Sequence, residues 1–423
     1  MQTSLHGIAK KATQDKTYRF RNLFGLLTAP FLIWCWQFLN RRAAPGVDRI
    51  RARDDEERFF ANILDLTERV RRGLYRARLI LRCYIPKGGG KWRPLGLPVT
   101  EDKLLQTAVA KILEAIYEQD FRPCSFGYRP GIGAREAVKQ VSRTLYFRPI
   151  HDVVEADIRG YFDHIDHEHL LEMLQRRVDD KPFLRLIKKW LTAGILDTGG
   201  QVLHPVTGTP QGGIISPILA NIYLHYVLDE WFEDVVKRYC RGEAYLVRYA
   251  DDFVCAFQYQ DDAERFYRVL GKRLGKYGLT LAEDKTRIVR FRRHHREDKA
   301  HFVFLGFEFR WTVSWKTGKV FLLKRTAPKK QRQAVRHVAD WCHRRRHWRL
   351  DVLMERVKAK LRGYYNYFGV RGNAKSLADF YDRTIKLLFK WLNRRSQKTS
   401  YTWEAFKHLL HEFDLPRPRL VWS

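Results

Sequence analysis

The chain has 423 residues, of which 45% are hydrophobic and 14% aromatic, so it is long enough for more than one folded domain and too apolar to be disordered. Lys and Arg number 79 against 47 Asp and Glu, which gives a formal net charge of +32. Repulsion of that size is tolerated most easily when a polyanion neutralises it. Composition therefore favours a nucleic-acid-binding protein over one whose basic surface serves only solubility.

The cysteines do not form a metal-binding pattern. They are scattered, with no C-x-x-C pair and no Cys/His cluster, which argues against structural zinc and predicts buried, reduced thiols in a cytoplasmic protein. Two His-rich segments, 293–296 and 343–347, are surrounded by cations and predict basic surface. The cysteines are Cys35, Cys83, Cys124, Cys240, Cys255 and Cys342.

Near the N-terminus, Phe24–Leu39 is strongly apolar and imitates a membrane anchor. It is shorter than the roughly 20 residues needed to span a bilayer, and it contains Pro30 and Gln37. We therefore expect a packed helical N-terminal extension over residues 1–50 and no membrane partner.

The next segments predict helices around a hairpin. Helices are expected later in the chain at 216–228 and 261–278, and periodic apolar residues favour two earlier helices at 54–73 and 104–116. Between these helices, Lys87 and Arg93 flank the Gly88–Gly90 tip of an expected hairpin, where two cations could close on an incoming triphosphate. A solvated basic turn is the alternative for this tip.

Acidic residues stand at the ends of two expected strands. A strand from Val153 ends near Asp157, and strands at 245–249 and 253–257 form a hairpin around Asp251 and Asp252. Two carboxylates about 4 Å apart repel by about 4 kcal/mol at an effective dielectric of 20, so apolar surroundings imply a compensating cation, most plausibly Mg²⁺. The hairpin alone is also consistent with a solvated turn. Together the three carboxylates can converge on two ions about 3.5 to 4 Å apart, the arrangement used for nucleotidyl transfer.

Several motifs, in order along the chain, resemble those of group II intron-encoded reverse transcriptases and maturases. Tyr249–Asp252 reads YADD, like the YxDD box of reverse transcriptases, and 208–221 reads GTPQGGIISPILAN, like the segment after the first catalytic strand. The other matching segments are APGVD at 44–48, the fingers strands at 82–98, SFGYRPG at 125–131, LAEDKT at 281–286 and FLGF at 304–307.

The resemblance implies an α+β right-hand polymerase, with fingers and an antiparallel palm sheet over 51–320 and a helical thumb or maturase domain X over 321–423. Such an enzyme copies an RNA template by adding dNTPs to the 3′-hydroxyl of a DNA primer, with two Mg²⁺ ions or Mn²⁺ in their place. It also implies binding of the parent group II intron RNA, help with its splicing, and retrohoming into a DNA target.

The family motifs also imply roles for individual residues. Asp157, Asp251 and Asp252 are expected to be catalytic and to bind the metal ions, together with the backbone of Ile158. The expected dNTP contacts are Lys87, Arg93, the amides from Arg159, Gly160, Tyr161 and Phe162, the side chain of Gln211 beside the nucleotide, and Lys285 near the leaving pyrophosphate. Phe162 stands where a ring would clash with a 2′-hydroxyl, although ordinary core packing is the alternative for it.

After residue 320 bases cluster, and an apolar stripe predicts a helix from Leu350 to Phe368. The segments at 361–368 and 389–395 resemble the thumb and domain X, with most of their aromatic residues expected in the core. No Cys/His pattern of an HNH endonuclease follows, so we expect no cleavage of the second target strand. Two alternatives remain for the function. The chain could be an RNA-binding splicing factor with a dispensable polymerase site, or a domesticated reverse transcriptase in DNA repair or phage defence. The sequence leaves the oligomeric state open.

Overall fold

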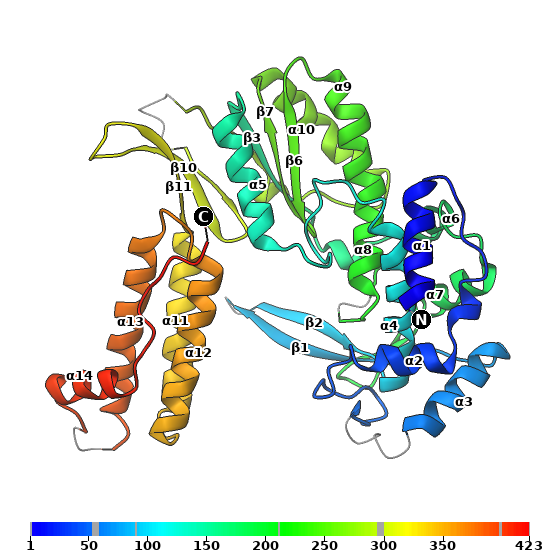
Figure 1. Cartoon of the computed structure of the whole chain (residues 1–423), viewed down its shortest axis with the longest axis horizontal. Helices are drawn as coiled ribbons and strands as arrows, with labels where there is room; N and C mark the ends of the chain where they lie inside the picture. The colour runs from blue at the N-terminus through cyan, green and yellow to red at the C-terminus, as the bar shows by residue number, and fades with distance from the viewer. Residues whose placement is uncertain are drawn as a thin grey trace.

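The structure is a computed structural model, and it describes residues 2–52, 59–88, 91–209, 212–293, 300–396 and 400–422. Figure 1 shows three regions: a central sheet flanked by helices, an N-terminal group of helices from which a long hairpin extends below the sheet, and a helical bundle beside that hairpin. The bundle lies below and to the left of the central sheet in this view.

The central sheet has the strand order β6-β7-β3-β8 and is antiparallel throughout. Its strands are β3 (Asp152–Asp157), β6 (Ala244–Tyr249), β7 (Asp252–Phe257) and β8 (Arg287–Arg290). The predicted strand and hairpin are confirmed, with one shift. Asp252 is the first residue of β7 and pairs with Tyr249, so the connection consists of Ala250 and Asp251 alone.

Helices cover both faces of this sheet. Successive side chains of a strand point to opposite sides, so neighbouring residues of β3 pack into different cores. Val154 packs in the main core with α8 (Ser216–Leu224) and α10 (Gln260–Gly275). Val153 packs on the other side with α5 (Ala134–Phe147). The helix expected at 261–278 is thus confirmed as α10.

A second sheet, with the order β11-β10-β9, extends the α5 side of the molecule. It consists of β9 (Phe302–Phe304), β10 (Phe307–Val313) and β11 (Val320–Thr326), and its phenylalanines join the same core as α5. This sheet was not predicted from the sequence.

The N-terminal half carries the long hairpin and the helices that support it. The hairpin of β1 (Ile80–Gly88) and β2 (Lys91–Leu97) is confirmed and extends through β4 (Ile195–Leu196) and β5 (Val202–Leu203) in the order β2-β1-β4-β5. Residues 89 and 90 of its tip lie outside the described residues. The surrounding helices are α1 (Gln2–Gln14), η1 (Phe24–Leu26), α2 (Ala29–Trp36), α3 (Phe59–Arg71), α4 (Thr100–Tyr117), α6 (His167–Gln175) and α7 (Lys181–Leu191).

The apolar N-terminal segment folds as expected. Phe31, Leu32, Cys35 and Trp36 of α2 are buried in the main core. Within the described part of the chain, none of the helices combines the length and the apolarity that crossing a membrane would require.

The prediction of a single α-helix over 216–228 is wrong in its second half. α8 ends at Leu224, and the chain continues in wider π-helical turns, η4 (His225–Asp229) and η5 (Phe232–Val236), before the short α9 (Lys237–Tyr239). Such turns are rare and often occur at functional sites. Here η4 turns Asp229 into the core, where it is fully buried.

The C-terminal bundle consists of α11 (Pro328–Arg345), α12 (Leu350–Phe368), α13 (Ala374–Leu392) and α14 (Trp403–Glu412). Tyr364 and Tyr365 of α12 lie in its core, as expected. Asn373, which is fully buried before α13, donates to the Thr326 hydroxyl and accepts from the Thr326 amide, so it fixes the bundle to the end of β11. All six cysteines are free, and four of them are buried.

The buried His225 predicts a pH dependence of stability. Burial, followed by the charges of Arg248 and neighbouring arginines, lowers the pKa of His225 to about 3. In the unfolded chain the pKa is about 6.5, so the unfolded state binds the extra proton, and stability falls as the pH falls from about 6.5 towards 3. We expect His225→Gln to reduce the loss of unfolding free energy between pH 7 and pH 5 by about 2 kcal/mol in urea titrations. The exposed His347→Gln is the control, and an equal pH effect in both variants would contradict the assignment.

Candidate functional site

The three aspartates converge at one end of the central sheet. Asp157 is the last residue of β3, and it lies directly opposite Asp252, the first residue of β7, in the antiparallel register. Asp251 precedes Asp252 in the turn. Ile158 follows β3 and is held by an isolated bridge to Leu281. The structure thus brings together the carboxylates that come from segments about a hundred residues apart in the sequence.

The electrostatics of this cluster favour a cation. Burial raises the pKa of Asp252 to about 7, and the carboxylates of Asp157 and Asp251 raise it as well, while a hydrogen bond from the Leu305 amide lowers it. Burial and Asp157 also raise the pKa of Asp251, against the charges of Arg93 and Lys285. A divalent ion would relieve this mutual repulsion.

Lys285 supplies a positive charge in the present conformation. It lies on η6 (Glu283–Lys285), and its ammonium group is paired with the carboxylate of Asp157, which raises the pKa of the lysine. Within the described residues, no group of three or more His, Cys, Asp and Glu side chains is arranged to hold a metal ion. The donor oxygens nevertheless fit a hard divalent cation, which would take the place of the lysine at Asp157.

A buried arginine holds the turn that carries Asp251. Arg248 of β6 is completely buried and binds Asp229 through two hydrogen bonds, Nε to Oδ1 at 2.7 Å and Nη2 to Oδ2 at 2.5 Å. The same guanidinium donates to the carbonyl oxygen of Ala250 at 3.0 Å and to the Ser125 hydroxyl at 2.7 Å. Asn221 of α8 accepts a further bond at 3.2 Å.

The turn itself is strained and closely packed. Ala250 has a φ of 56°, in the left-handed region that non-glycine residues rarely adopt. A Cβ atom at Gly127 would lie 2.3 Å from the Ala250 nitrogen, so only glycine fits there. Asn221 donates to the Gly127 carbonyl at 2.5 Å, which joins this contact to the arginine network.

A tight turn follows Asp157. Gly160 has a φ of 55°, and η3 (Tyr161–Asp163) comes directly after it. The amide of Arg159 donates to Thr280, which leaves the amides of Gly160, Tyr161 and Phe162 as candidates for a triphosphate. The buried Tyr161 hydroxyl donates to the Ala220 carbonyl at 2.5 Å, and the half-buried Phe162 ring packs edge-on against Tyr128 with 6.3 Å between centroids.

The fingers hairpin lies next to this turn. Arg93 of β2 pairs with Ile85 of β1, and its charge acts on Asp251. Lys87 is in β1, close to the tip. Gln211 lies outside the described residues. A Cβ atom at Gly212 would lie 2.5 Å from the Gly96 carbonyl of β2, so this glycine allows close contact with the fingers hairpin.

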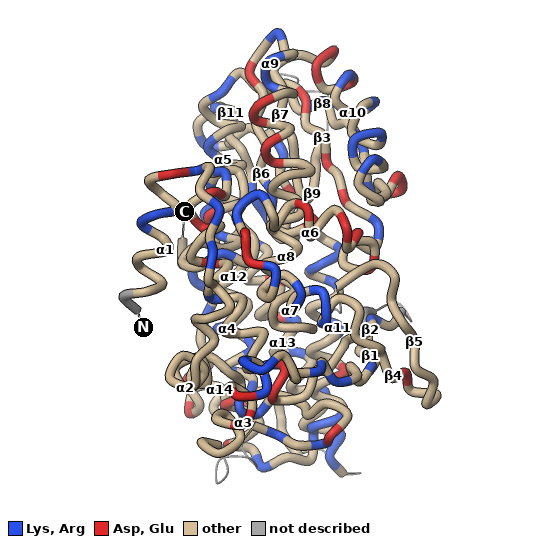
Figure 2. Tube along the Cα trace, turned by 90° about the vertical axis from the view of Figure 1, so that its right-hand side faces the viewer, with Lys and Arg blue, Asp and Glu red and all other residues tan. Residues whose placement is uncertain are grey.

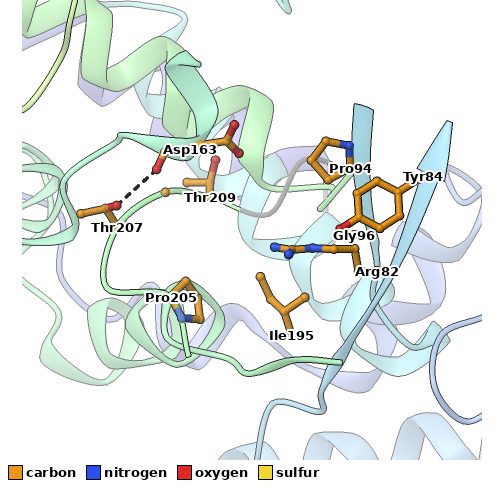
Figure 3. A pocket seen from close by; sticks show the side chains of 10 residues that line it. Arg82, Tyr84, Pro94, Gly96, Asp163, Ile195, Pro205, Thr207 and Thr209 are labelled. Carbon is orange, nitrogen blue, oxygen red and sulfur yellow. Dashed lines mark hydrogen bonds between the residues drawn. The ribbon is translucent and has the colours of Figure 1, made fainter. Parts of the chain in front are cut away.

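A cavity of about 290 Å³ opens between the fingers hairpin and the loop that precedes Gln211. Figure 3 shows the Arg82 guanidinium extending between Ile195 and the Tyr84 ring, with Asp163 and Thr209 on the opposite side. The Thr207 hydroxyl donates to the Asp163 carbonyl at 3.2 Å, which closes the loop onto the turn after β3. The cavity thus adjoins the turn that carries Phe162.

The bundle reaches the aspartates through one residue. Leu305, between β9 and β10, has a φ of 50°, and its amide donates to Asp252. Its carbonyl accepts from the Tyr367 hydroxyl of α12 at 2.9 Å.

Comparison with known families agrees with this geometry. The family described as reverse transcriptase (RNA-dependent DNA polymerase) matches residues 85–309, more than half of the 423-residue chain. The chain belongs to the reverse transcriptase family. A second family, the group II intron maturase-specific domain, matches residues 331–409 of this reverse transcriptase, so the resemblance seen in the motifs is confirmed.

Curated relatives match only part of their own length. Protein YkfC of Escherichia coli is 33% identical over 248 residues, which cover 56% of this chain and 63% of the relative. The group II intron-encoded protein LtrA of Lactococcus lactis is 37% identical over 224 residues, 52% of this chain and 37% of the relative. This reverse transcriptase therefore spans less than two thirds of either protein. Similarity to the solved telomerase of Candida albicans is weak, with a TM-score of 0.45 and 13% identity over 80% of this chain and 63% of that one.

Arg248 and Asp229, which hold the turn that carries Asp251, were not predicted from the sequence. One signal was available for Arg248: it stands in an otherwise apolar strand, where a charge is buried only with a partner. The sequence contains no comparable signal for Asp229, because its inward direction depends on the π-helical turn.

Breaking the buried pair should destabilise this reverse transcriptase strongly. Asp229→Asn leaves the Arg248 charge uncompensated, and we expect a loss of about 3 to 5 kcal/mol of unfolding free energy in urea titrations. Asp261→Asn is the matched control, because Asp261 forms an exposed pair with Arg241 at 2.8 Å and should cost less than about 1 kcal/mol. Equal losses in the two variants would show that the buried pair has no special role.

Proposed function

We propose that the chain is an RNA-directed DNA polymerase that transfers nucleotides from dNTPs to a primer 3′-hydroxyl with two Mg²⁺ ions. The observation that carries the proposal is the position of Asp157 directly opposite Asp252 at the end of the palm sheet, with Asp251 in the adjoining turn. Two ions held there would activate the hydroxyl and stabilise the departing pyrophosphate, and Mn²⁺ would serve in their place.

The roles proposed for the other site residues follow from their positions around the aspartates. Asp157, Asp251, Asp252 and the backbone of Ile158 would hold the ions. The amides of Gly160 to Phe162 would receive the triphosphate tail, with Arg93 and Lys87 reaching it from the fingers. Lys285, now paired with Asp157, would be released when an ion binds there and would then be free to contact the pyrophosphate. Gln211, which lies outside the described residues, is proposed to contact the nucleotide.

Intron RNA is the proposed second partner. The match of residues 331–409 to the maturase-specific domain supports binding of a group II intron RNA and assistance in its splicing. Figure 2 shows Lys and Arg along the trace of both the palm and the helical bundle, so a polyanion could be held over a wide surface. We further propose domain limits near residues 50 and 320 and, from the six free thiols, a cytoplasmic location.

The polymerase assignment is tested by extension of a DNA primer on an RNA template with Mg²⁺. We expect Asp251→Asn and Asp252→Asn each to lower the rate by about a thousandfold or more, because each removes a charged ligand worth several kcal/mol in the transition state. RNA binding should persist in both. Asp261→Asn, which removes an exposed carboxylate, should extend normally, and undiminished synthesis by Asp251→Asn would refute the metal assignment.

Phe162 is proposed to exclude ribonucleotides. Replacing the ring by Ala should raise incorporation of NTP relative to dNTP by about tenfold or more, since a steric difference of this size in a pocket is worth about 1 to 3 kcal/mol. Tyr161→Phe is the matched control, because it removes only a buried hydroxyl from the neighbouring residue. If the ratio is the same in Phe162→Ala and in the unmodified chain, the ring serves only in packing.

A further inference from the structure

A large groove lies on the α5 side of the palm, apart from the aspartates. It has a volume of about 880 Å³ and runs between α5, the β10–β11 hairpin and the connection from α12 to α13. None of the residues proposed for metal or dNTP binding lines it. Its lining is Lys139, Ser142, Arg143, Tyr146, Phe147, Ser314, Thr317, Lys319, Phe321, Leu322, Lys324, Arg371 and Gly372.

The charge of the groove is positive and unbalanced. No Asp or Glu is among its described lining residues, and among the described residues no carboxylate forms an ion pair with Lys139, Arg143, Lys319, Lys324 or Arg371. Burial lowers the pKa of Lys324, and the charges of Lys139 and Arg371 lower it further. Cations that repel one another in this way gain most from an anion placed between them.

Exposed aromatic rings accompany these cations. Phe147 at the end of α5 is 75% exposed, and Trp315 at the turn of the β10–β11 hairpin is 89% exposed. An adjoining hollow of about 690 Å³ shares Tyr146 and Phe147 with the groove and adds Arg148, Arg292 and Arg293. The Arg293 guanidinium lies over the Tyr146 ring, 5.0 Å from its centroid.

The groove is separated from the catalytic end by the fold itself. The apolar side of α5 packs on the palm sheet, so its basic side faces outwards. Figure 1 shows α5 and the β10–β11 hairpin on the side of the sheet away from α8 and α10, with the fingers hairpin below the sheet. A strand bound beside α5 would therefore not occupy the space next to the aspartates.

We infer that this groove binds a single-stranded nucleic acid segment, as a second site distinct from the polymerase site. Cations spaced along it suit successive phosphates, and the exposed rings at its edges offer stacking surfaces for bases. Its volume exceeds what a single phosphate ion would need. The inference does not depend on the proposed polymerase activity, since binding is measured without synthesis.

The test uses the full chain with its polymerase site occupied by an unlabelled RNA–DNA duplex that has a one-nucleotide template overhang. A labelled 20-nucleotide single strand, as RNA and in a second arm as DNA, is then titrated by fluorescence anisotropy over a range of salt. We expect the double variant Arg143→Gln, Lys319→Gln to bind about ten- to thirtyfold more weakly near 0.1 M salt and its log–log salt slope to fall by about 1.4, since each single-strand phosphate contact contributes about 0.7.

The matched control is Lys272→Gln, Lys276→Gln, which removes the same charge from two exposed positions, one in the last turn of α10 and one just after it, and should bind within about twofold of the unmodified chain. Phe147→Ala, Trp315→Ala should weaken binding with an unchanged salt slope, because stacking releases no counterions. Two results would overturn the proposal. One is an equal loss of affinity in the groove and control variants, and the other is displacement of the strand by polyglutamate at equal charge. So would a parallel loss of primer extension in the groove variant, since the groove would then belong to the polymerase site.

Discussion

The buried pair of Arg248 and Asp229 is the contact on which the arrangement of the palm depends. A guanidinium with no solvent exposure is tolerated only when its donors are met, and here the acceptors come from η4, α8, the segment at Ser125 and the turn at Ala250. Each of these elements must be in place for the charge to be satisfied. The pair therefore specifies one conformation of the β6–β7 turn, even though a buried ion pair adds little net stability by itself.

Glycines then allow the surrounding elements to approach this turn. Gly127 lets the segment after Ser125 pass against Ala250, and Gly212 lets the loop before α8 reach β2 of the fingers. At both positions a side chain would collide with backbone, which cannot move aside as a flexible side chain would. Backbone contacts thus hold the segment after Ser125 against the β6–β7 turn and the loop before α8 against the fingers hairpin.

The sequence predicted much of this arrangement, because the relevant signals are local. Runs rich in β-branched and aromatic residues predicted β3, β6 and β7, and helical periodicity predicted α4, α10 and α12. The β10–β11 hairpin was not predicted, although Phe307–Val313 alternates apolar and polar residues as a strand does; its partner, Val320–Thr326, shows no such alternation. The π-helical turns were missed because nothing in local propensity distinguishes them from an α-helix. The contact of Lys285 with Asp157 depends on the pairing of β8 with β3, and no sequence pattern specifies how two side chains meet across such a pair.

Leu305 connects movements of the helical bundle to the palm. Its carbonyl accepts from Tyr367 of α12 and its amide donates to Asp252, so two peptide planes that meet at this one residue join the helical bundle to a carboxylate of the palm. A tilt of α12 would move this residue and alter the bond that lowers the pKa of Asp252. The position of the bundle and the pKa of Asp252 are therefore coupled through Leu305.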